Sequence, residues 1–178
     1  MTTVADILKY IESFAPAYMK ESWDNVGLLC GSRSTPVTKI LVALDPFEGV
    51  CKEAADWGAE LIVTHHPIIF QPAKSITDDT SIGRSILALC AAGISAINAH
   101  TNLDCTPGGV NDVLAATLGL TNVQVISPVG TNEDDVPYGL LRCGDVAEQF
   151  MDAFLPMSNP HWVAKVCAMW IPASPSAR

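Results

Sequence analysis

Hydrophobic positions recur along this chain in two patterns, one typical of helices and one typical of buried strands. Residues 4–14 carry apolar side chains three or four positions apart, which predicts an amphipathic helix that Pro16 ends. The same spacing, followed shortly by a glycine that would stop a helix, recurs in 47–57, 82–90 and 110–118. The pattern therefore predicts a helix in each of these four segments.

Between the predicted helices lie short runs that are apolar throughout. Such runs indicate strands buried on both faces, and they occupy 40–44, 61–63 and 94–99. The first of them favours a central strand that helices cover. Residues 23–31 add a loop that leads into a short apolar strand closed by glycine. Strands and helices that alternate at this spacing predict an α/β fold, with a mostly parallel or mixed sheet and helices on both faces.

The last third of the chain has a less regular pattern. Two segments fit strands and one fits a short helix, namely 123–126, 138–143 and 147–154. We expect an α/β domain at 1–125 and the start of a second segment at 126–178. The tail from about residue 157 is atypical, because it contains none of the 19 acidic residues.

Composition and charge narrow the classes of function. Hydrophobic residues make up 49% of the 178 residues and charged residues 16%, which supports a sizeable core. The formal net charge of −9 argues against nonspecific binding to nucleic acid, which needs cationic surfaces. The sequence shows no charged leader followed by an apolar segment and no run of about 18 apolar residues. We therefore expect a cytoplasmic protein.

The six cysteines are scattered along the chain without a C-x-x-C pair, and several lie in apolar runs. This distribution favours free thiols over a disulfide framework. Cys105 directly follows Asp104, so a metal-binding thiol is a minor alternative at that position.

Side chains that can bind metals follow the predicted strands. In the segment LIVTHHPIIF, residues 61–70, His65 and His66 stand where a buried strand should end. Neighbouring residues of an extended chain point to opposite sides, so two imidazoles can reach two ions of a close pair more easily than a single ion. The alternative is that both histidines only cap the strand through hydrogen bonds to loop backbone.

Three successive strands end on such residues. Asp45 ends the first strand, His65 and His66 the second, and His100 and Asp104 follow the third. If the strands are parallel neighbours, all five side chains lie at one edge of the sheet. Imidazoles with a carboxylate favour Zn²⁺, Fe²⁺, Mn²⁺ or Ni²⁺ over Ca²⁺. We predict metal binding by His65, His66 and Asp104. His100 is a ligand, a partner of a ligand or a general base, and Asp45 has a supporting position.

Four motifs in this order and spacing resemble one family closely. They are SWDNVGLLCG, THHPIIF, NAHTNLD and GGVNDVLAATLGL, and the similarity runs from about residue 3 to about residue 154. The family is the NIF-three-like or YbgI-type family, also known as type 2 homologues of GTP cyclohydrolase I. The resemblance implies an α/β protein that assembles as a toroidal homohexamer with a dinuclear metal centre in each subunit. It also implies that His65, His66 and Asp104 bind the metals and that His100 lies beside them.

The chain departs from the family pattern near its C-terminus. Family members are longer and supply a further His-x-x-x-Glu pair of ligands, whereas His161 is followed four residues later by Lys165. The resemblance therefore implies a truncated chain. An incomplete site would bind its two divalent ions weakly, or would bind only one.

The function that the resemblance implies is a metal-dependent hydrolase acting on a nucleotide or heterocycle. Metal-activated water would attack the substrate, and His100 would take part in proton transfer. GTP as a substrate follows from the family name alone. The alternative is a noncatalytic metal-binding or regulatory oligomer, or a chain inactive because it is truncated. The expected partners are other copies of the chain and a small-molecule substrate, and neither a membrane nor nucleic acid is expected.

Overall fold

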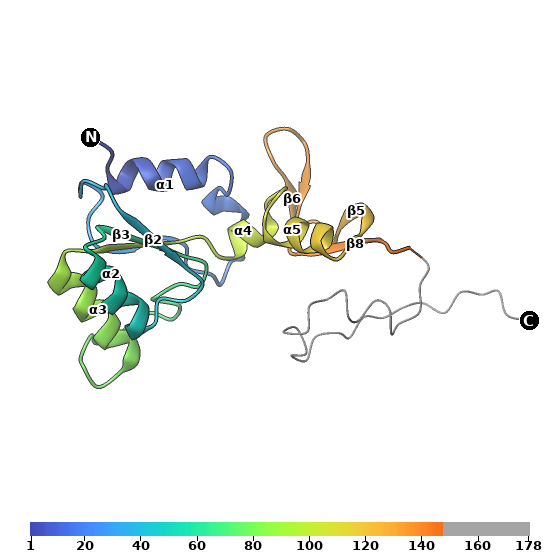
Figure 1. Ribbon diagram of the computed structural model, residues 1–178. Helices are drawn as coiled ribbons and strands as arrows, with labels where there is room; N and C mark the ends of the chain where they lie inside the picture. The colour runs from blue at the N-terminus through green and yellow to red at the C-terminus, as the bar shows by residue number, and fades with distance from the viewer. Residues whose placement is uncertain (148–178) are drawn as a thin grey trace, which may run out of the picture.

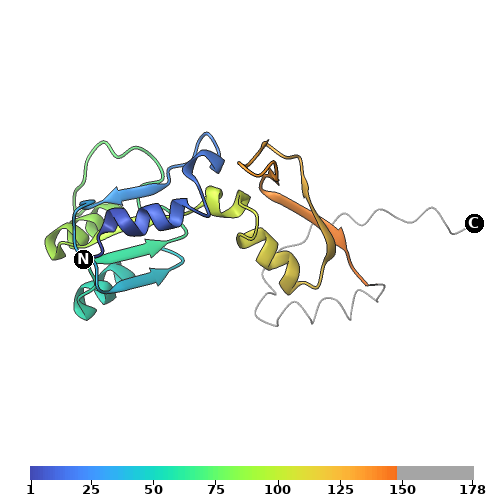
Figure 2. The same cartoon turned by 90° about the horizontal axis from the view of Figure 1, so that it is seen from above.

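The computed structural model describes residues 1–147, which form two parts joined by a short helix. Figure 1 and Figure 2 show a first part with a sheet between helices and a second part in which α5 (Val110–Thr117) lies beside a pair of strands. The short helix α4 (Thr101–Cys105) stands between the two parts. Nothing in the sequence pattern predicted α4, because five residues are too few to show a helical period.

The sheet of the first part has four strands in the order β1-β4-β3-β2. They are β1 (Gly27–Cys30), β2 (Ile40–Ala43), β3 (Leu61–Thr64) and β4 (Ser95–Asn98). Strands β2, β3 and β4 are parallel, and β1 runs antiparallel to β4. The predicted α/β fold with a mixed sheet is confirmed. Because Ala43, Thr64 and Asn98 lie level with one another, the three parallel strands end at the same edge.

Strand β2 lies at an edge of this sheet within the described part of the chain, so the central position predicted for 40–44 is wrong. The side chain of Val42 is 75% exposed and that of Leu44 is 62% exposed. An apolar run shows that a strand can be buried, but it does not show how many neighbouring strands flank it.

Helices cover both faces of the sheet. Helices α2 (Glu48–Trp57) and α3 (Ser81–Ala92) pack over one face, and α1 (Val4–Glu12) packs over the other. Strand β3 contributes to the hydrophobic core on each face of the sheet, because consecutive side chains of a strand point to opposite faces. Leu61 is buried against α1, while Ile62 is buried on the face that α2 and α3 cover. The stiff central strand therefore fixes the position of the residues that follow it.

The helix ends agree with the sequence. Thr3 caps α1 with a capping box, in which its hydroxyl accepts from the backbone N–H of Asp6 and the Asp6 carboxylate accepts from the N–H of Thr3. Gly58 ends α2 with a φ of 73°, a left-handed conformation that glycine adopts without strain. A short 3-10 turn, η1 (Ala17–Met19), follows α1 and was not predicted.

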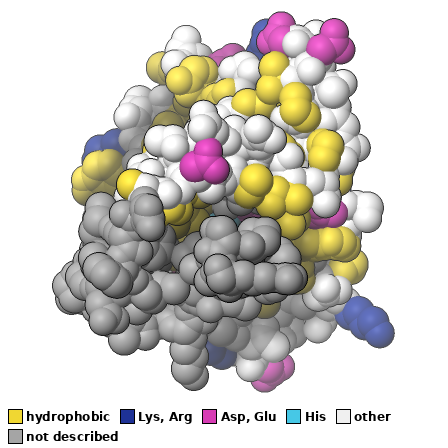
Figure 3. All heavy atoms as spheres, turned by 90° about the vertical axis from the view of Figure 1, so that its right-hand side faces the viewer, with side chains coloured by type: hydrophobic (Ala, Val, Ile, Leu, Met, Phe, Trp, Pro, Cys, Tyr) yellow, Lys and Arg dark blue, Asp and Glu magenta, His cyan; other side chains and the backbone are white. Residues whose placement is uncertain are grey.

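The second part is built on two antiparallel strands, β5 (Thr121–Ile126) and β8 (Leu141–Asp145). Strand β5 contains the whole strand expected over 123–126, whereas only 141–143 of the strand expected over 138–143 lie in β8. Between them, β6 (Gly130–Thr131) and β7 (Pro137–Tyr138) form a small pair. Figure 3 looks at the molecule from this side, where hydrophobic side chains lie exposed among polar ones.

The division of the chain near residue 125 stays a prediction. The helix expected over 147–154 and the tail from 157 lie outside the described residues, apart from residue 147.

Arg142 connects the second part to α4. It forms an ion pair with Asp112 and donates hydrogen bonds to the carbonyl oxygens of Gly139, Cys105 and Thr106, at 2.6, 3.3 and 3.4 Å. The Arg142 side chain is almost fully buried. A buried guanidinium with acceptors on several segments holds those segments in one arrangement.

The cysteines in the described part of the chain are free thiols, as predicted. Burial raises the pKa of Cys30 to about 12 and that of Cys105 to about 11, so both thiols stay protonated near neutral pH. Cys167 lies outside the described residues. None of the helices within residues 1–147 has the length and apolar composition needed to cross a membrane.

Candidate metal centre

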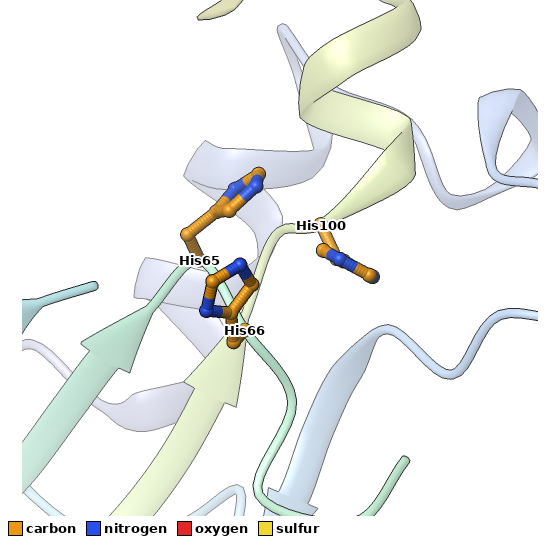
Figure 4. Close-up of side chains that lie close together, drawn as sticks. All are labelled: His65, His66 and His100. Atoms are coloured by element: carbon orange, nitrogen blue, oxygen red, sulfur yellow. The ribbon is translucent and has the colours of Figure 1, made fainter. Parts of the chain in front are cut away.

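Three imidazoles meet at the edge where the parallel strands end. His65 and His66 directly follow β3, and His100 follows β4 after one intervening residue. Figure 4 shows their rings close together beside these strand ends. One ring nitrogen of each histidine lies within 4.8 Å of those of the other two. The structure thus brings together the histidines that the sequence placed at one sheet edge, while their roles as ligands stay a prediction.

Each of these imidazoles has a hydrogen bond at Nδ1. The acceptors and distances are Ala99 O at 3.0 Å for His65, Asp45 Oδ1 at 2.6 Å for His66 and Asp24 Oδ1 at 2.9 Å for His100. Because all three partners accept hydrogen bonds, they favour the neutral tautomer in which Nδ1 carries the proton and Nε2 has the lone pair. This tautomer is the one in which histidine binds a metal ion through Nε2.

Asp104, on α4, places a carboxylate beside His65, although within residues 1–147 the group of side chains that all lie within 4.8 Å of one another contains only the three histidines. Its Oδ1 lies 3.6 Å from His65 Nε2, which is too far for a hydrogen bond. Two ligands that each lie about 2.0 to 2.2 Å from one tetrahedral ion are about 3.4 Å apart. The spacing of this pair therefore suits joint binding of one ion. Burial raises the pKa of Asp104 above its usual value although His65 and His100 oppose the shift, and a nearby cation would favour the ionised carboxylate.

Asp24 lies next to His100. On the sequence alone, turn chemistry explains this loop residue as well as a position facing a ligand does. Its side chain is fully buried. Oδ1 accepts hydrogen bonds from His100 Nδ1 and from the Asn25 N–H at 2.8 Å, while Oδ2 accepts from the Thr101 N–H at 3.0 Å and from the Thr101 hydroxyl. Burial alone would raise the pKa of Asp24, but these hydrogen bonds outweigh it and hold the pKa below the usual value. Asp24 is therefore a fixed anion that orients His100.

Asp45 orients His66 in the same way as Asp24 orients His100, because its carboxylate accepts a hydrogen bond from His66 Nδ1. The His66 side chain is 43% exposed, compared with 19% for His65 and 17% for His100. The cluster is therefore most open to solvent at His66. The three imidazoles lie within reach of one another, and the Asp104 carboxylate lies beside one of them, His65. Imidazole and carboxylate ligands suit Zn²⁺, Fe²⁺, Mn²⁺ or Ni²⁺, so the chemistry of these residues fits a divalent metal ion.

Comparison with protein families and relatives gives a consistent result. The model of the family described as Duf34/NIF3 (NGG1p interacting factor 3) matches residues 2–165. A Clostridium perfringens protein named GTP cyclohydrolase 1 type 2 homolog is 51% identical over 126 residues, which cover 70% of this chain and 48% of that protein. A protein of the same name from Halalkalibacterium halodurans is 42% identical over 125 residues, which cover 70% of this chain and 34% of that protein. The chain thus spans about half the length of these relatives, or less.

Solved structures show the same fold. A Bacillus cereus protein related to NIF3 is 40% identical with a TM-score of 0.68, over 72% of this chain and 35% of that one. Reduced HcgD from Methanocaldococcus jannaschii is 30% identical with a TM-score of 0.71, over 88% of this chain and 59% of that one.

Proposed function

This chain belongs to the Duf34/NIF3 family, and we propose that it is a metal-dependent hydrolase acting on a nucleotide or a related heterocycle. The observation that carries the proposal is the group of three imidazoles whose Nδ1 atoms are all held by acceptors, which leaves three Nε2 lone pairs for metal binding. Relatives named GTP cyclohydrolase 1 type 2 homolog make GTP the first substrate to test.

In this proposal His65, His66 and Asp104 hold the metal. The spacing of His65 Nε2 and Asp104 Oδ1 supports a shared ion, and the exposure of His66 gives solvent and substrate access. A divalent ion bound here supplies a Lewis acid that lowers the pKa of water toward neutrality. That each subunit binds two ions in a dinuclear centre stays a prediction from the family resemblance.

His100 takes part in proton transfer. The hydrogen bond to Asp24 fixes its tautomer, and the buried carboxylate stabilises the positive charge that the ring carries after it accepts a proton. The same geometry would also let His100 act as a third imidazole ligand. The variant His100→Gln separates the two roles. Loss of turnover with metal content retained supports proton transfer, whereas loss of the metal identifies a ligand.

The test of the proposed function is hydrolysis of GTP with added Mn²⁺ or Zn²⁺. We expect turnover in the wild-type chain, its loss in His65→Ala and its retention in Asp56→Ala, which removes an exposed carboxylate that pairs with Lys52 on its own helix. Bound metal without turnover of any nucleotide would contradict the hydrolase and would favour a noncatalytic metal-binding or regulatory protein.

Assembly as a homohexamer and a cytoplasmic location also stay predictions. Size-exclusion chromatography with light scattering measures the assembly directly. A stable monomer at micromolar concentration would contradict the oligomer.

A further inference from the structure

Two large aromatic side chains lie beside the histidine cluster with much of their surface exposed. Trp23 is 56% exposed and Phe70 is 41% exposed. Their ring centroids are 5.9 Å apart and their planes meet at 72°. Both rings also lie against His100, with centroid distances of 6.5 Å for Trp23 and 6.2 Å for Phe70. The aromatic pair therefore borders the group of residues that would carry out the chemistry.

The backbone on either side of this pair is held firmly although the rings are exposed. Trp23 precedes Asp24, whose buried carboxylate is bound to His100 and Thr101. Phe70 follows Ile69, whose carbonyl oxygen accepts a hydrogen bond of 2.6 Å from the Asn25 side chain. This hydrogen bond connects the two segments that carry the aromatic rings. A fixed backbone lets exposed rings bind a ligand with little loss of conformational freedom.

We propose that Trp23 and Phe70 form a stacking platform that binds the planar heterocyclic ring of the substrate beside the histidines. This inference rests on the proposed function, because it names the part of the substrate that the same site recognises. An edge-to-face pair leaves ring surface free for a stacked ligand, and any planar base can stack on an aromatic ring. Stacking on an aromatic ring needs only a planar ligand face, so it acts independently of the three carboxylates beside the histidines, those of Asp24, Asp45 and Asp104.

The experiment is titration calorimetry with two probes, guanosine 5′-monophosphate and ribose 5-phosphate. The two compounds share the sugar phosphate, and only the first has the planar ring. The proteins are the wild-type full chain, Trp23→Leu, Trp23→Phe and Trp57→Leu. Trp57, the last residue of α2, is a matched control because it is 51% exposed and its ring lies under the Lys39 ammonium group instead of beside the histidines.

We expect Trp23→Leu to bind guanosine 5′-monophosphate about 5- to 150-fold more weakly than the wild-type chain does, which is the range for loss of one stacked aromatic ring. Trp23→Phe should retain most of the affinity, and Trp57→Leu all of it. The affinity for ribose 5-phosphate should be the same in Trp23→Leu and in the wild-type chain.

Three results would overturn the platform. These are no binding of guanosine 5′-monophosphate by the wild-type chain, equal affinity in Trp23→Leu, and an equal loss of affinity for ribose 5-phosphate, which would show a deformed site. The proposed function fails separately. Binding that depends on Trp23, together with no turnover of any nucleotide, would refute the hydrolase and leave the platform standing. Turnover of GTP with an unchanged KM in Trp23→Leu would refute the platform alone.

Discussion

Replacing Asp24 with asparagine tests whether its buried carboxylate organises the site. The two carboxylate oxygens accept hydrogen bonds from two backbone N–H groups, one on Oδ1 from Asn25 and one on Oδ2 from Thr101. An asparagine has only one oxygen, and its NH2 group cannot accept a hydrogen bond. Whichever way the amide turns, one of these N–H groups loses its acceptor.

The size of the effect follows from burial. With the amide nitrogen at the Oδ2 position, the N–H of Thr101, a residue that is 3% exposed, has no partner. With the nitrogen at the Oδ1 position, the N–H of Asn25 loses its partner and His100 must accept at Nδ1, which moves its proton to Nε2. A buried polar group left without a partner costs about 1–3 kcal/mol. We therefore expect Asp24→Asn to lower the free energy of unfolding by about 1–3 kcal/mol.

Urea denaturation followed by tryptophan fluorescence measures this loss. The control is Asp56→Asn, the same chemical change at an exposed aspartate, for which we expect a change within about 0.5 kcal/mol. If Asp24→Asn were as stable as the control, the carboxylate would not hold the segments that the hydrogen bonds connect. The role of Asp24 in orienting His100 would then be wrong.

Three further predictions concern the framework. Gly49→Ala on α2 should raise the free energy of unfolding by up to about 1 kcal/mol, because alanine favours a helix more than glycine does. The added Cβ would meet no atom within 4 Å, so no clash offsets this gain. Gly83→Ala on α3 should instead lower the free energy of unfolding by about 1–3 kcal/mol, because that Cβ would overlap the carbonyl oxygen of Thr77; a stabilised variant in thermal unfolding would contradict this packing. The hydrogen bond and charge of Arg142 hold the pKa of Asp112 below its usual value. The ion pair therefore stabilises the folded chain fully at pH values above the ordinary carboxyl pKa of about 3.9. This stabilisation is lost as the pH falls through the lower pKa that Asp112 has in the folded chain. The difference in stability between the wild-type chain and Asp112→Asn should therefore shrink between about pH 6 and pH 3, and a difference that grows would refute the assignment.

The sequence predicts well that the histidines gather at one sheet edge, because this depends on strands that the apolar runs mark clearly. His65, His66 and His100 each follow such a run, and parallel neighbours end at one edge. The partner of His100 could not be predicted. Asp24 lies 76 residues away in sequence, and its contact depends on β1 pairing antiparallel with β4, which no local pattern shows.

The edge position of β2 shows a second limit of sequence patterns. Residues 40–44 are apolar on both sides, yet within residues 1–147 only β3 pairs with β2, and Val42 is left exposed. Strand order is set by contacts that are distant along the chain, so the composition of a single strand does not fix its place in the sheet. Trp23 and Phe70 likewise looked like ordinary apolar residues, because only the fold brings both of them to His100.

The most direct test is the metal content of the purified chain after dialysis against a micromolar concentration of Zn²⁺, determined by elemental analysis. The proteins to compare are the wild-type chain, His65→Ala, Asp104→Ala and the exposed-carboxylate control Asp56→Ala. The site predicts about one or more ions per wild-type chain and per control chain, and loss of the metal in the other two variants. A wild-type chain that holds no more metal than His65→Ala would contradict a metal centre at these histidines.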